Sequence, residues 1–312
     1  MIIRRPEDVT AAVLAALDGA PDARFREIMA AAVRHLHGFV RDARLTEREF
    51  QQACGWIAAL GKATTDSHNE VVLAAGSLGV SQLVCLQNNG DGGARPTTAN
   101  MLGPFWRMGS PRTPDGGSIV RSPTRGEPIF VTVHVIDRDA RPVGGADVDV
   151  WQASPEGLYE NQDPLQADMN LRGTFITDAA GTIRFRSVRP AGYPIPVDGP
   201  VGALLRAQGR HNMRPAHLHF LVHKDGFKTQ HSQIYSHDDP HLATDVQFGV
   251  TEALIGRYVE HRGDDVPWGD DAAAVWHALE CTLAIEPGDA SLPRAPISGK
   301  VAQAAPPSYS VR

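Results

Sequence analysis

The stretch Arg214-Pro215-Ala216-His217-Leu218-His219-Phe220 has the pattern of a β-strand, and the rest of the chain is organised around it. Its apolar residues continue through Leu221 and Val222, and its two histidines occupy positions i and i+2. Alternate side chains of a strand project to the same face of a sheet, so His217 and His219 would lie side by side. Two imidazoles placed in this way can share one metal ion, or they can simply line a polar face of the sheet.

Two tyrosines in loop-like stretches upstream accompany these histidines. Tyr159 ends the stretch Gly157-Leu158-Tyr159, and Tyr193 lies in Gly192-Tyr193-Pro194, where glycine and proline favour turns. The chain has only 5 tyrosines, so two in such positions call for a reason. One reason is structural, because tyrosine is amphipathic and suits the rim of a β-sandwich. The other is that both phenols belong to the same site as the histidines.

Composition limits the class of protein. A chain of 312 residues can bury a large core, in one large domain or two smaller ones. The net charge of −6, without a long basic run, argues against nucleic acid as a partner. Three widely separated cysteines, Cys54, Cys85 and Cys281, form neither a disulfide framework nor a Cys-x-x-Cys metal site, which fits a reducing cytoplasm.

Neither a membrane span nor a secretory signal is expected. The longest apolar stretches, such as residues 71–80, contain glycine and serine and fall short of the ~20 residues that cross a bilayer. The first seven residues lack an apolar core followed by a small-residue cleavage site. We therefore expect a cytoplasmic protein.

Residues 1 to about 90 have the pattern of helices. Apolar residues recur at three- and four-residue steps between Phe25 and Val40, as in an amphipathic helix. Two stretches with the form of a capping box each predict a further helix start. These stretches are Thr46-Glu47-Arg48-Glu49, followed by a helix that Gly61 can end, and Ser67-His68-Asn69-Glu70, followed by a helix over 71–86.

A β-rich region follows a connection, rich in Gly, Pro, Ser and Thr, over residues 90–128. After this connection apolar residues alternate with polar ones, and many short strands separated by polar turns indicate an antiparallel β-sandwich. The strand-like segments cover residues 129–137, 146–153, 174–177, 182–188, 216–223, 229–235 and 276–285. The proline-rich tail from Pro287 is predicted to be poorly packed or wrapped on a neighbour.

The expected fold is therefore α+β, with an N-terminal helical segment followed by an antiparallel β-sandwich domain, to which the resemblance described next assigns catalysis. We place the two domains at residues 1–100 and 101–312.

With these motifs in place, the sequence resembles the intradiol ring-cleaving dioxygenases, the family of the catechol and hydroxyquinol 1,2-dioxygenases. The matching stretches stand in the family's order and roughly its spacing, which is more specific than any one of them. They are Leu102-Gly103-Pro104-Phe105, Val150-Trp151-Gln152-Ala153, Gly157-Leu158-Tyr159, Asn170-Leu171-Arg172-Gly173-Thr174, Arg184-Phe185-Arg186-Ser187-Val188, Gly192-Tyr193-Pro194-Ile195-Pro196, Asp198-Gly199-Pro200, Gly209-Arg210-His211 and the strand from Arg214 to Phe220.

The resemblance implies a ferric ion, Fe(3+), held by Tyr159, Tyr193, His217 and His219, with water or hydroxide completing the set. Phenolate oxygen suits this hard ion, whose charge drives the loss of a phenol proton at pKa about 10. A small aromatic diol would bind the iron through both hydroxyl oxygens and displace Tyr193, which can then accept a proton. Reaction with O2 would cut the ring between the two hydroxyl-bearing carbons and give a muconate.

Other residues take roles from the same resemblance. Arg214 matches the family's arginine beside the ring, where a fixed guanidinium can stabilise developing negative charge, although a surface salt bridge is the alternative. Gln233 falls where catechol-type members carry a glutamine near the site, or it is a solvent-facing strand residue. The implied substrate pocket, in which some residues have a purely structural role, consists of Leu73, Gly76, Gly103, Pro104, Phe105, Ile195 and Pro196.

The family motifs conflict on the substrate. The stretches Tyr193 to Gly202 and Phe248-Gly249-Val250 resemble the hydroxyquinol branch. However, Gln233 stands where that branch is expected to have a histidine, and Gly76 where it often has an aspartate for the third hydroxyl. Burying that hydroxyl without a partner costs roughly 1 to 3 kcal/mol. We favour hydroxyquinol (1,2,4-trihydroxybenzene), giving 3-hydroxy-cis,cis-muconate or maleylacetate, with catechol or a substituted catechol as the alternative.

Hypotheses of other classes remain open. A non-catalytic metal-binding β-sandwich, holding zinc for example, would use the histidines and leave the tyrosines unexplained. A non-enzymic interaction module would need no metal, and extradiol cleavage would use Fe(II), which tyrosinate ligands disfavour. In the intradiol family the N-terminal helices form a homodimer contact, in some members around a bound lipid, so the resemblance implies a homodimer here. The apolar helical stripe could equally be ordinary core.

Overall fold

The structure, a computed structural model, describes residues 2–263, 265–269 and 273–302. The chain divides into two compact units, Met1–Ala58 and Ala59–Arg312. The first unit is helical, and the second holds further helices and all the described strands.

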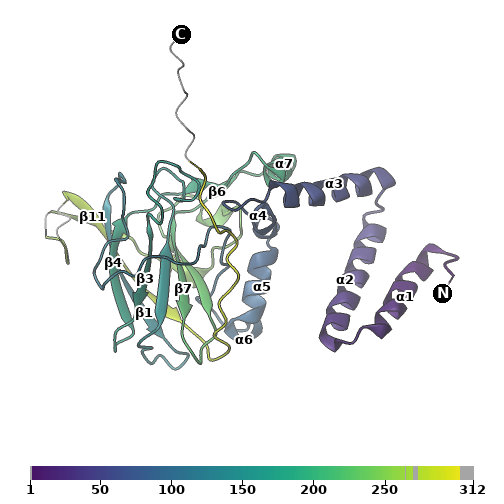
Figure 1. The fold of residues 1–312 in the computed structure, drawn as a ribbon, viewed down its shortest axis with the longest axis horizontal. Helices are drawn as coiled ribbons and strands as arrows, with labels where there is room; N and C mark the ends of the chain where they lie inside the picture. Colours follow the sequence, from purple (N-terminus) through teal and green to yellow (C-terminus); the bar gives the residue numbers. More distant parts are fainter. Residues whose placement is uncertain (1, 264, 270–272, 303–312) are drawn as a thin grey trace, which may run out of the picture. The chain divides into compact units, whose positions relative to one another are not determined.

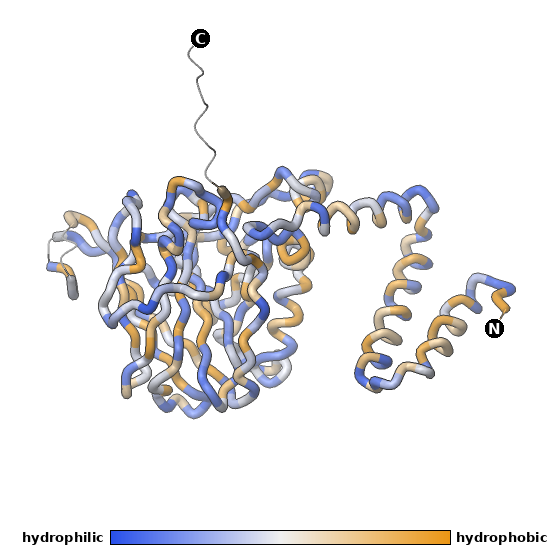
Figure 2. Tube along the Cα trace, viewed as in Figure 1, coloured by the Kyte–Doolittle hydropathy of each residue, from blue (hydrophilic) through white to orange (hydrophobic). Residues whose placement is uncertain are grey.

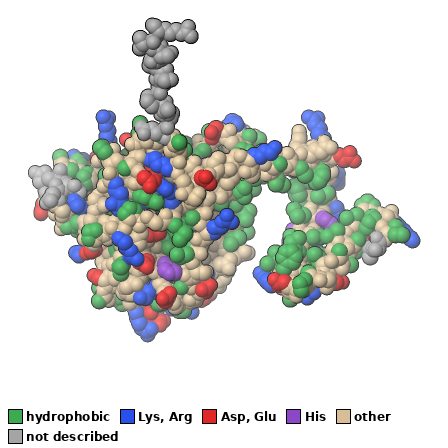
Figure 3. Space-filling view, in the orientation of Figure 1, with side chains coloured by type: hydrophobic (Ala, Val, Ile, Leu, Met, Phe, Trp, Pro, Cys, Tyr) green, Lys and Arg blue, Asp and Glu red, His purple; other side chains and the backbone are tan. Residues whose placement is uncertain are grey.

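The first unit contains α1 (Pro6–Ala16), η1 (Leu17–Gly19), α2 (Ala23–Asp42) and most of α3 (Glu47–Ala63). The predicted capping box of α3 is confirmed, because Thr46 N donates to Glu49 Oε2 at 2.9 Å and Glu49 N to Thr46 Oγ1 at 3.3 Å. α1 was not predicted. Figure 3 shows hydrophobic side chains over the surface of this unit. Its exposed large apolar residues are Ile2, Ile3, Val9, Val13, Phe25, Ile28, Leu36, Phe39, Val40, Phe50 and Ile57.

The helix predicted over 71–86 is two helices, α4 (Glu70–Ser77) and α5 (Val80–Asn88), which are bent by 75°. The break lies at Gly79, whose φ of +74° is left-handed and cannot continue a helix. Asn69, and not Ser67, caps α4 by accepting from Val72 N at 3.0 Å. Among the described helices, none alone is long and apolar enough to cross a membrane, and α4 with α5 meets that measure only across this bend.

The second unit is built on a β-sandwich of two main sheets, with strand orders β10-β11-β1-β4 and β3-β2-β7-β8-β9 (Figure 1). Polar and apolar residues alternate along its strands (Figure 2), as the sequence pattern predicts. The strands that match predictions are β1 (Pro128–Ile136), β2 (Asp147–Trp151), β3 (Arg172–Ile176), β4 (Thr182–Val188), β7 (His217–His223), β8 (Gln230–Ser236) and β11 (Val275–Ala284).

Several short elements were not predicted, because two to eight residues carry too little periodicity. They are α6 (Gly90–Gly93), β5 (Tyr193–Pro194), α7 (Pro200–Ala207), β6 (Met213–Arg214), η2 (Leu242–Thr244), η3 (Glu252–Leu254), β9 (Ile255–Gly256) and β10 (Val259–Arg262).

The sheets are mixed and not strictly antiparallel, which corrects the expected architecture in one detail. β1 pairs in parallel with β11, and β8 pairs in parallel with β9. The other pairs are antiparallel. A period of two identifies a strand but carries no information on the direction of its partner.

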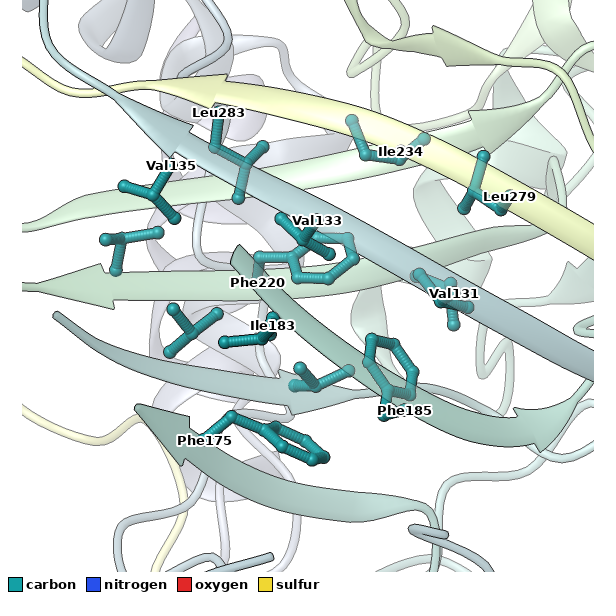
Figure 4. Packing of buried hydrophobic residues seen from close by; sticks show 14 of the residues in the cluster. Val131, Val133, Val135, Phe175, Ile183, Phe185, Phe220, Ile234, Leu279 and Leu283 are labelled. Carbon is teal, nitrogen blue, oxygen red and sulfur yellow. The ribbon is translucent and has the colours of Figure 1, made fainter. Parts of the chain in front are cut away.

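The core lies between the two main sheets (Figure 4). β7 is buried along its whole length except at His223, which is half-buried. Leu218, Phe220 and Val222 belong to the core, so the alternation of the strand directs His217 and His219 to the opposite face of the sheet. Other core residues from both sheets are Val131, Val133, Val135, Phe175, Ile183, Phe185, Ile234, Leu279 and Leu283.

The tail from Pro287 to residue 302 packs on the second unit itself. Ile297 is buried, Ser298 N and Gly299 N donate to Asp66 O at 2.9 Å, and Val301 N donates to Asn161 O at 2.9 Å. The remainder of the predicted loose tail lies outside the described residues.

Phe185→Ala should lower the free energy of unfolding by about 3–5 kcal/mol, because it leaves a cavity beside Phe175 and Phe220. The ring centroids of these two residues lie 5.4 and 6.4 Å from the centroid of the Phe185 ring. Urea unfolding measures this change. The control is Ile176→Ala on β3, where the side chain is 57% exposed and the expected loss is below about 1 kcal/mol. Equal losses in the two variants would contradict the assigned core.

Candidate active site

The structure brings the two predicted histidines and the two predicted tyrosines together. The Nε2 atoms of His217 and His219 lie 3.0 Å apart, and His219 Nε2 lies 2.9 Å from Tyr159 Oη. Tyr159 Oη lies 3.0 Å from Tyr193 Oη. All four side chains are buried. Two nitrogen and two oxygen donors, which come from β7, from β5 and from the loop after β2, therefore meet at one point.

Local contacts hold the two tyrosine loops against each other. Gly157 has a φ of +85°, and a Cβ at this position would lie 3.0 Å from Tyr193 Cβ, so the close approach favours glycine. Tyr193 pairs with Arg214 in the short ladder of β5 and β6. Next to Tyr159, Glu160 Oε1 accepts from Arg172 Nε at 2.7 Å and from Arg107 at 2.7 Å. This buried ion network fixes the loop that carries Tyr159.

Both imidazoles are neutral and available as ligands. His217 Nδ1 donates to Pro215 O at 2.6 Å, because a carbonyl only accepts, and this leaves the Nε2 lone pair directed at the cluster. Burial, with the charge of Arg214, lowers the pKa of His217 to about 3. Burial, followed by His217, lowers the pKa of His219 well below its usual value. His219 stacks on Trp151 with ring centroids 4.7 Å apart.

The phenols need a positive charge before they can ionise. Burial, with the neighbouring Tyr193, raises the pKa of Tyr159 well above 10. Burial also raises the pKa of Tyr193, and the charge of Arg214 only partly offsets this effect. A cation among the four donors would reverse both shifts, because opposite charge favours the phenolate.

The chemistry of this donor set fits a hard, highly charged ion such as Fe(III). In the part of the chain that the structure describes, no group of three or more His, Cys, Asp and Glu side chains could hold a metal ion. Thiolate and multi-carboxylate ligand sets are thus missing from these residues. Two imidazoles with two phenol oxygens are compatible with iron, and phenolate favours the ferric state.

Arg214 is buried, so the alternative of a surface salt bridge is wrong. Its Nε and Nη2 donate to the two carboxylate oxygens of Asp245, each at 3.1 Å. Nη2 also donates to Tyr235 Oη at 2.8 Å, and Nη1 to His217 Nε2 at 3.3 Å. Burial alone would lower the pKa of the guanidinium, but the charge of Asp245 outweighs it and holds that pKa high. A fixed cation therefore borders the donor cluster.

Gln233 is fully buried, so it is not a solvent-facing strand residue. Its Oε1 accepts from Arg214 Nη2 at 2.9 Å and from Tyr235 Oη at 2.7 Å, and its Nε2 donates to Met101 O at 2.7 Å. Gln233 thereby positions Arg214 and has no direct contact with the four donors among these bonds.

Sequence reasoning missed Asp245, Tyr235 and Asn100, which complete the polar network around Arg214. Asn100 Nδ2 donates to Tyr235 Oη at 3.3 Å and to Gly249 O at 2.9 Å. Asp245 forms an Asx turn, in which its Oδ1 accepts from Gln247 N and its Oδ2 from Gly249 N. Aspartate is common in such turns, so the turn was the one feature here that a local pattern could indicate. The long-range contacts to Arg214 left no trace in the sequence.

The predicted pocket residues are only partly gathered. A cavity of about 1180 Å³ has Gly103 in its wall, and a Cβ at Gly103 would lie 3.3 Å from His219 Cε1, but none of the four donors lines this cavity. Phe105 packs on the Tyr159 ring with centroids 4.7 Å apart. The remaining predicted residues do not line this cavity; they are Leu73, Gly76, Pro104, Ile195 and Pro196.

Comparison with known proteins gives a consistent match. The family model described as Dioxygenase matches residues 102–277, and the one described as Catechol dioxygenase N terminus matches residues 22–94. The chain is 42% identical over 248 residues to a hydroxyquinol 1,2-dioxygenase of Rhizobium sp. (strain MTP-10005), covering 79% of this chain and 83% of that protein.

A 6-chlorohydroxyquinol 1,2-dioxygenase of Cupriavidus pinatubonensis is 39% identical, over 81% of this chain and 91% of that protein. Among solved structures, the hydroxyquinol 1,2-dioxygenase of Pseudomonas putida DLL-E4 has a TM-score of 0.79 at 34% identity, covering 91% of this chain and 99% of that chain.

Asp245→Asn should lower the free energy of unfolding at pH 7 by about 3 kcal/mol, because it leaves the buried Arg214 without a countercharge. Burial raises the pKa of Asp245, but Arg214 outweighs burial and holds that pKa below its usual value. A depressed carboxyl pKa stabilises the fold above the unfolded pKa of about 3.9, and this contribution disappears as the pH falls through the folded pKa. The difference between wild type and variant should therefore narrow below about pH 4.

Urea unfolding at pH 7 and at acid pH measures both effects. Asp238→Asn is the control, because the Asp238 side chain is 48% exposed. Its ion pair with Arg189 therefore contributes at most about 1 kcal/mol. A loss for Asp245→Asn that matches this control at pH 7 would be incompatible with the assigned ion pair.

Proposed function

This chain belongs to the intradiol ring-cleaving dioxygenase family, and we propose that it cleaves hydroxyquinol with O2 to give 3-hydroxy-cis,cis-muconate, or its tautomer maleylacetate. The observation that carries this proposal is the buried cluster of two imidazoles and two phenols beside the fixed guanidinium of Arg214. The names of the relatives described above support hydroxyquinol as the substrate class.

We assign Tyr159, Tyr193, His217 and His219 as the ligands of Fe(3+). When bound there, ferric iron supplies the positive charge that ionises the phenols and the catecholic hydroxyls and makes the ring reactive toward O2. The protein holds the two imidazoles neutral and fixes the His217 tautomer through Pro215 O. Burial excludes water from the four donors.

Tyr193 would be the iron ligand that gives way to the substrate. Tyr159 lies within hydrogen-bonding distance of His219, packs on Phe105 and stands in the loop that Glu160 fixes. Tyr193 lies instead on β5, a strand of two residues. Its side chain can therefore move with less disruption, and its phenolate oxygen can take the proton that a substrate hydroxyl loses.

Arg214 stabilises negative charge that develops on the bound ring. Its guanidinium makes hydrogen bonds to Asp245, Gln233 and Tyr235, so its orientation is set before the substrate arrives. A preorganised cation in a dry site lowers the barrier without reorganising during the reaction.

Catechol or a substituted catechol is the second candidate substrate. The observation that favours it is Gly76 on α4, because glycine offers no carboxylate to a third hydroxyl of the substrate. The same four donors and Arg214 would serve either substrate. Cleavage of catechol or a substituted catechol would give a cis,cis-muconate.

We also propose that residues 1–100 act as a dimerisation and linker domain ahead of the catalytic domain at 101–312, and that the chain forms a homodimer with a lipid bound between the N-terminal helices. The exposed apolar residues of α1, α2 and α3 support an interaction surface there. Light scattering and mass spectrometry of an organic extract test the two parts of this proposal.

The iron-loaded protein should show a red-brown tyrosinate-to-iron absorption band that shifts when hydroxyquinol is added without oxygen. Tyr193→Phe should weaken this band and lower kcat on the order of 10²-fold, because a proton acceptor is lost. Visible spectroscopy and product analysis measure these changes.

The matched control is Tyr258→Phe, a buried tyrosine whose Oη donates to Ile234 O at 2.9 Å in the core. It should keep both the band and the activity. A colourless protein with full iron content would contradict the assignment of Tyr159 and Tyr193 as iron ligands.

A further inference from the structure

Gln247 fills the space that Gly76 leaves open on α4. A Cβ built at Gly76 would lie 1.8 Å from Gln247 Oε1. Gln247 is 3% exposed and belongs to the segment after η2 that also carries Asp245. A side chain from a distant part of the chain therefore takes the place of a side chain on the helix.

The carboxamide of Gln247 has one satisfied end and one free end. Its Nε2 donates to Ser77 Oγ at 2.7 Å and to Leu73 O at 3.5 Å, and this carbonyl identifies the nitrogen because it can only accept. No residue that the structure describes donates to Gln247 Oε1. Because Gln247 lines the cavity of about 1180 Å³, this oxygen is available to a bound molecule.

Gln247 is connected to Arg214, which borders the donor cluster, through Asp245. Gln247 and Gly103 both line the cavity of about 1180 Å³, and Gly103 is the residue that borders His219. Asp245 Oδ1 accepts from Gln247 N at 3.2 Å and from Arg214 Nε at 3.1 Å. One carboxylate thus fixes both the guanidinium and the start of the Gln247 side chain.

We propose that Gln247 is a specificity-determining residue, whose Oε1 accepts a hydrogen bond from the ring hydroxyl that the metal does not bind. This inference rests on the proposed function and names the group that reads the third hydroxyl. A neutral amide oxygen suits a neutral phenol, since it needs only one donor and brings no charge into a buried site. A catechol lacks this donor, so the site discriminates against it.

The test compares kcat/KM for hydroxyquinol, catechol and 4-methylcatechol in wild type and in Gln247→Leu. The variant should lower the ratio of hydroxyquinol to catechol about tenfold or more, because the acceptor is gone. The ratio of 4-methylcatechol to catechol should rise, since leucine favours an apolar substituent of similar size. The dissociation constant of hydroxyquinol, titrated without oxygen, should rise by a similar factor.

Two further variants make the test specific. Gly76→Ala keeps Gln247 but displaces its oxygen, so it should lower the same ratio, and it should add little in the Gln247→Leu background. Gln82→Leu is the matched control on α5, because Gln82 is also buried and does not line the cavity. It should leave both ratios unchanged.

The outcomes separate this inference from the proposed function. Suppose that wild type cleaves hydroxyquinol, but that Gln247→Leu lowers all three activities equally or changes none of them. Gln247 then does not bind the third hydroxyl, and only this inference is wrong. If wild type cleaves no catecholic substrate, the proposed function falls with it. If Gln247→Leu does not fold, an unchanged ratio in Gly76→Ala still overturns the inference.

Discussion

The burial of β7 on both faces is the constraint on which the site depends. Leu218, Phe220 and Val222 join the core between the sheets, and His217 and His219 face the other way. Because side chains alternate with a period of two, a slip of one residue would exchange the two faces. It would place imidazoles in an apolar core and leave aliphatic groups in the site. The hydrophobic pattern of one strand therefore sets both the stability of the sandwich and the position of the two imidazoles.

Burial also sets the charges in the site. The imidazoles lose their affinity for protons, whereas the phenols hold theirs more tightly. Arg214 keeps its charge only because Asp245 is buried with it. The protein thus presents four uncharged donors at one point and keeps one paired cation beside them. Such a site gains most from a ligand that brings positive charge.

The parts of this fold that the sequence could predict are those determined by neighbouring residues. Alternation identified seven strands, and the family motifs identified the four donors that the structure gathers. Gly79 was not recognised as a helix break, because a glycine in an apolar run is tolerated in helices unless its φ becomes positive. Asp245 and Gln247 were missed because their partners, Arg214 and Gly76, are far away in sequence. No local pattern distinguishes a buried aspartate from one in a surface turn.

The position of β11 affects how this fold can be made in the cell. β11, at Val275–Ala284, lies between β1 and β10 in its sheet. During translation, β1 and β4 can pair, but the other edge of β1 stays open until nearly the whole chain has left the ribosome. Closing so long a loop is slow, because chain entropy must be overcome before the contacts form. The nascent chain therefore carries an apolar strand with one unpaired edge while residues 137–284 are made, and this edge is open to aggregation until β11 arrives.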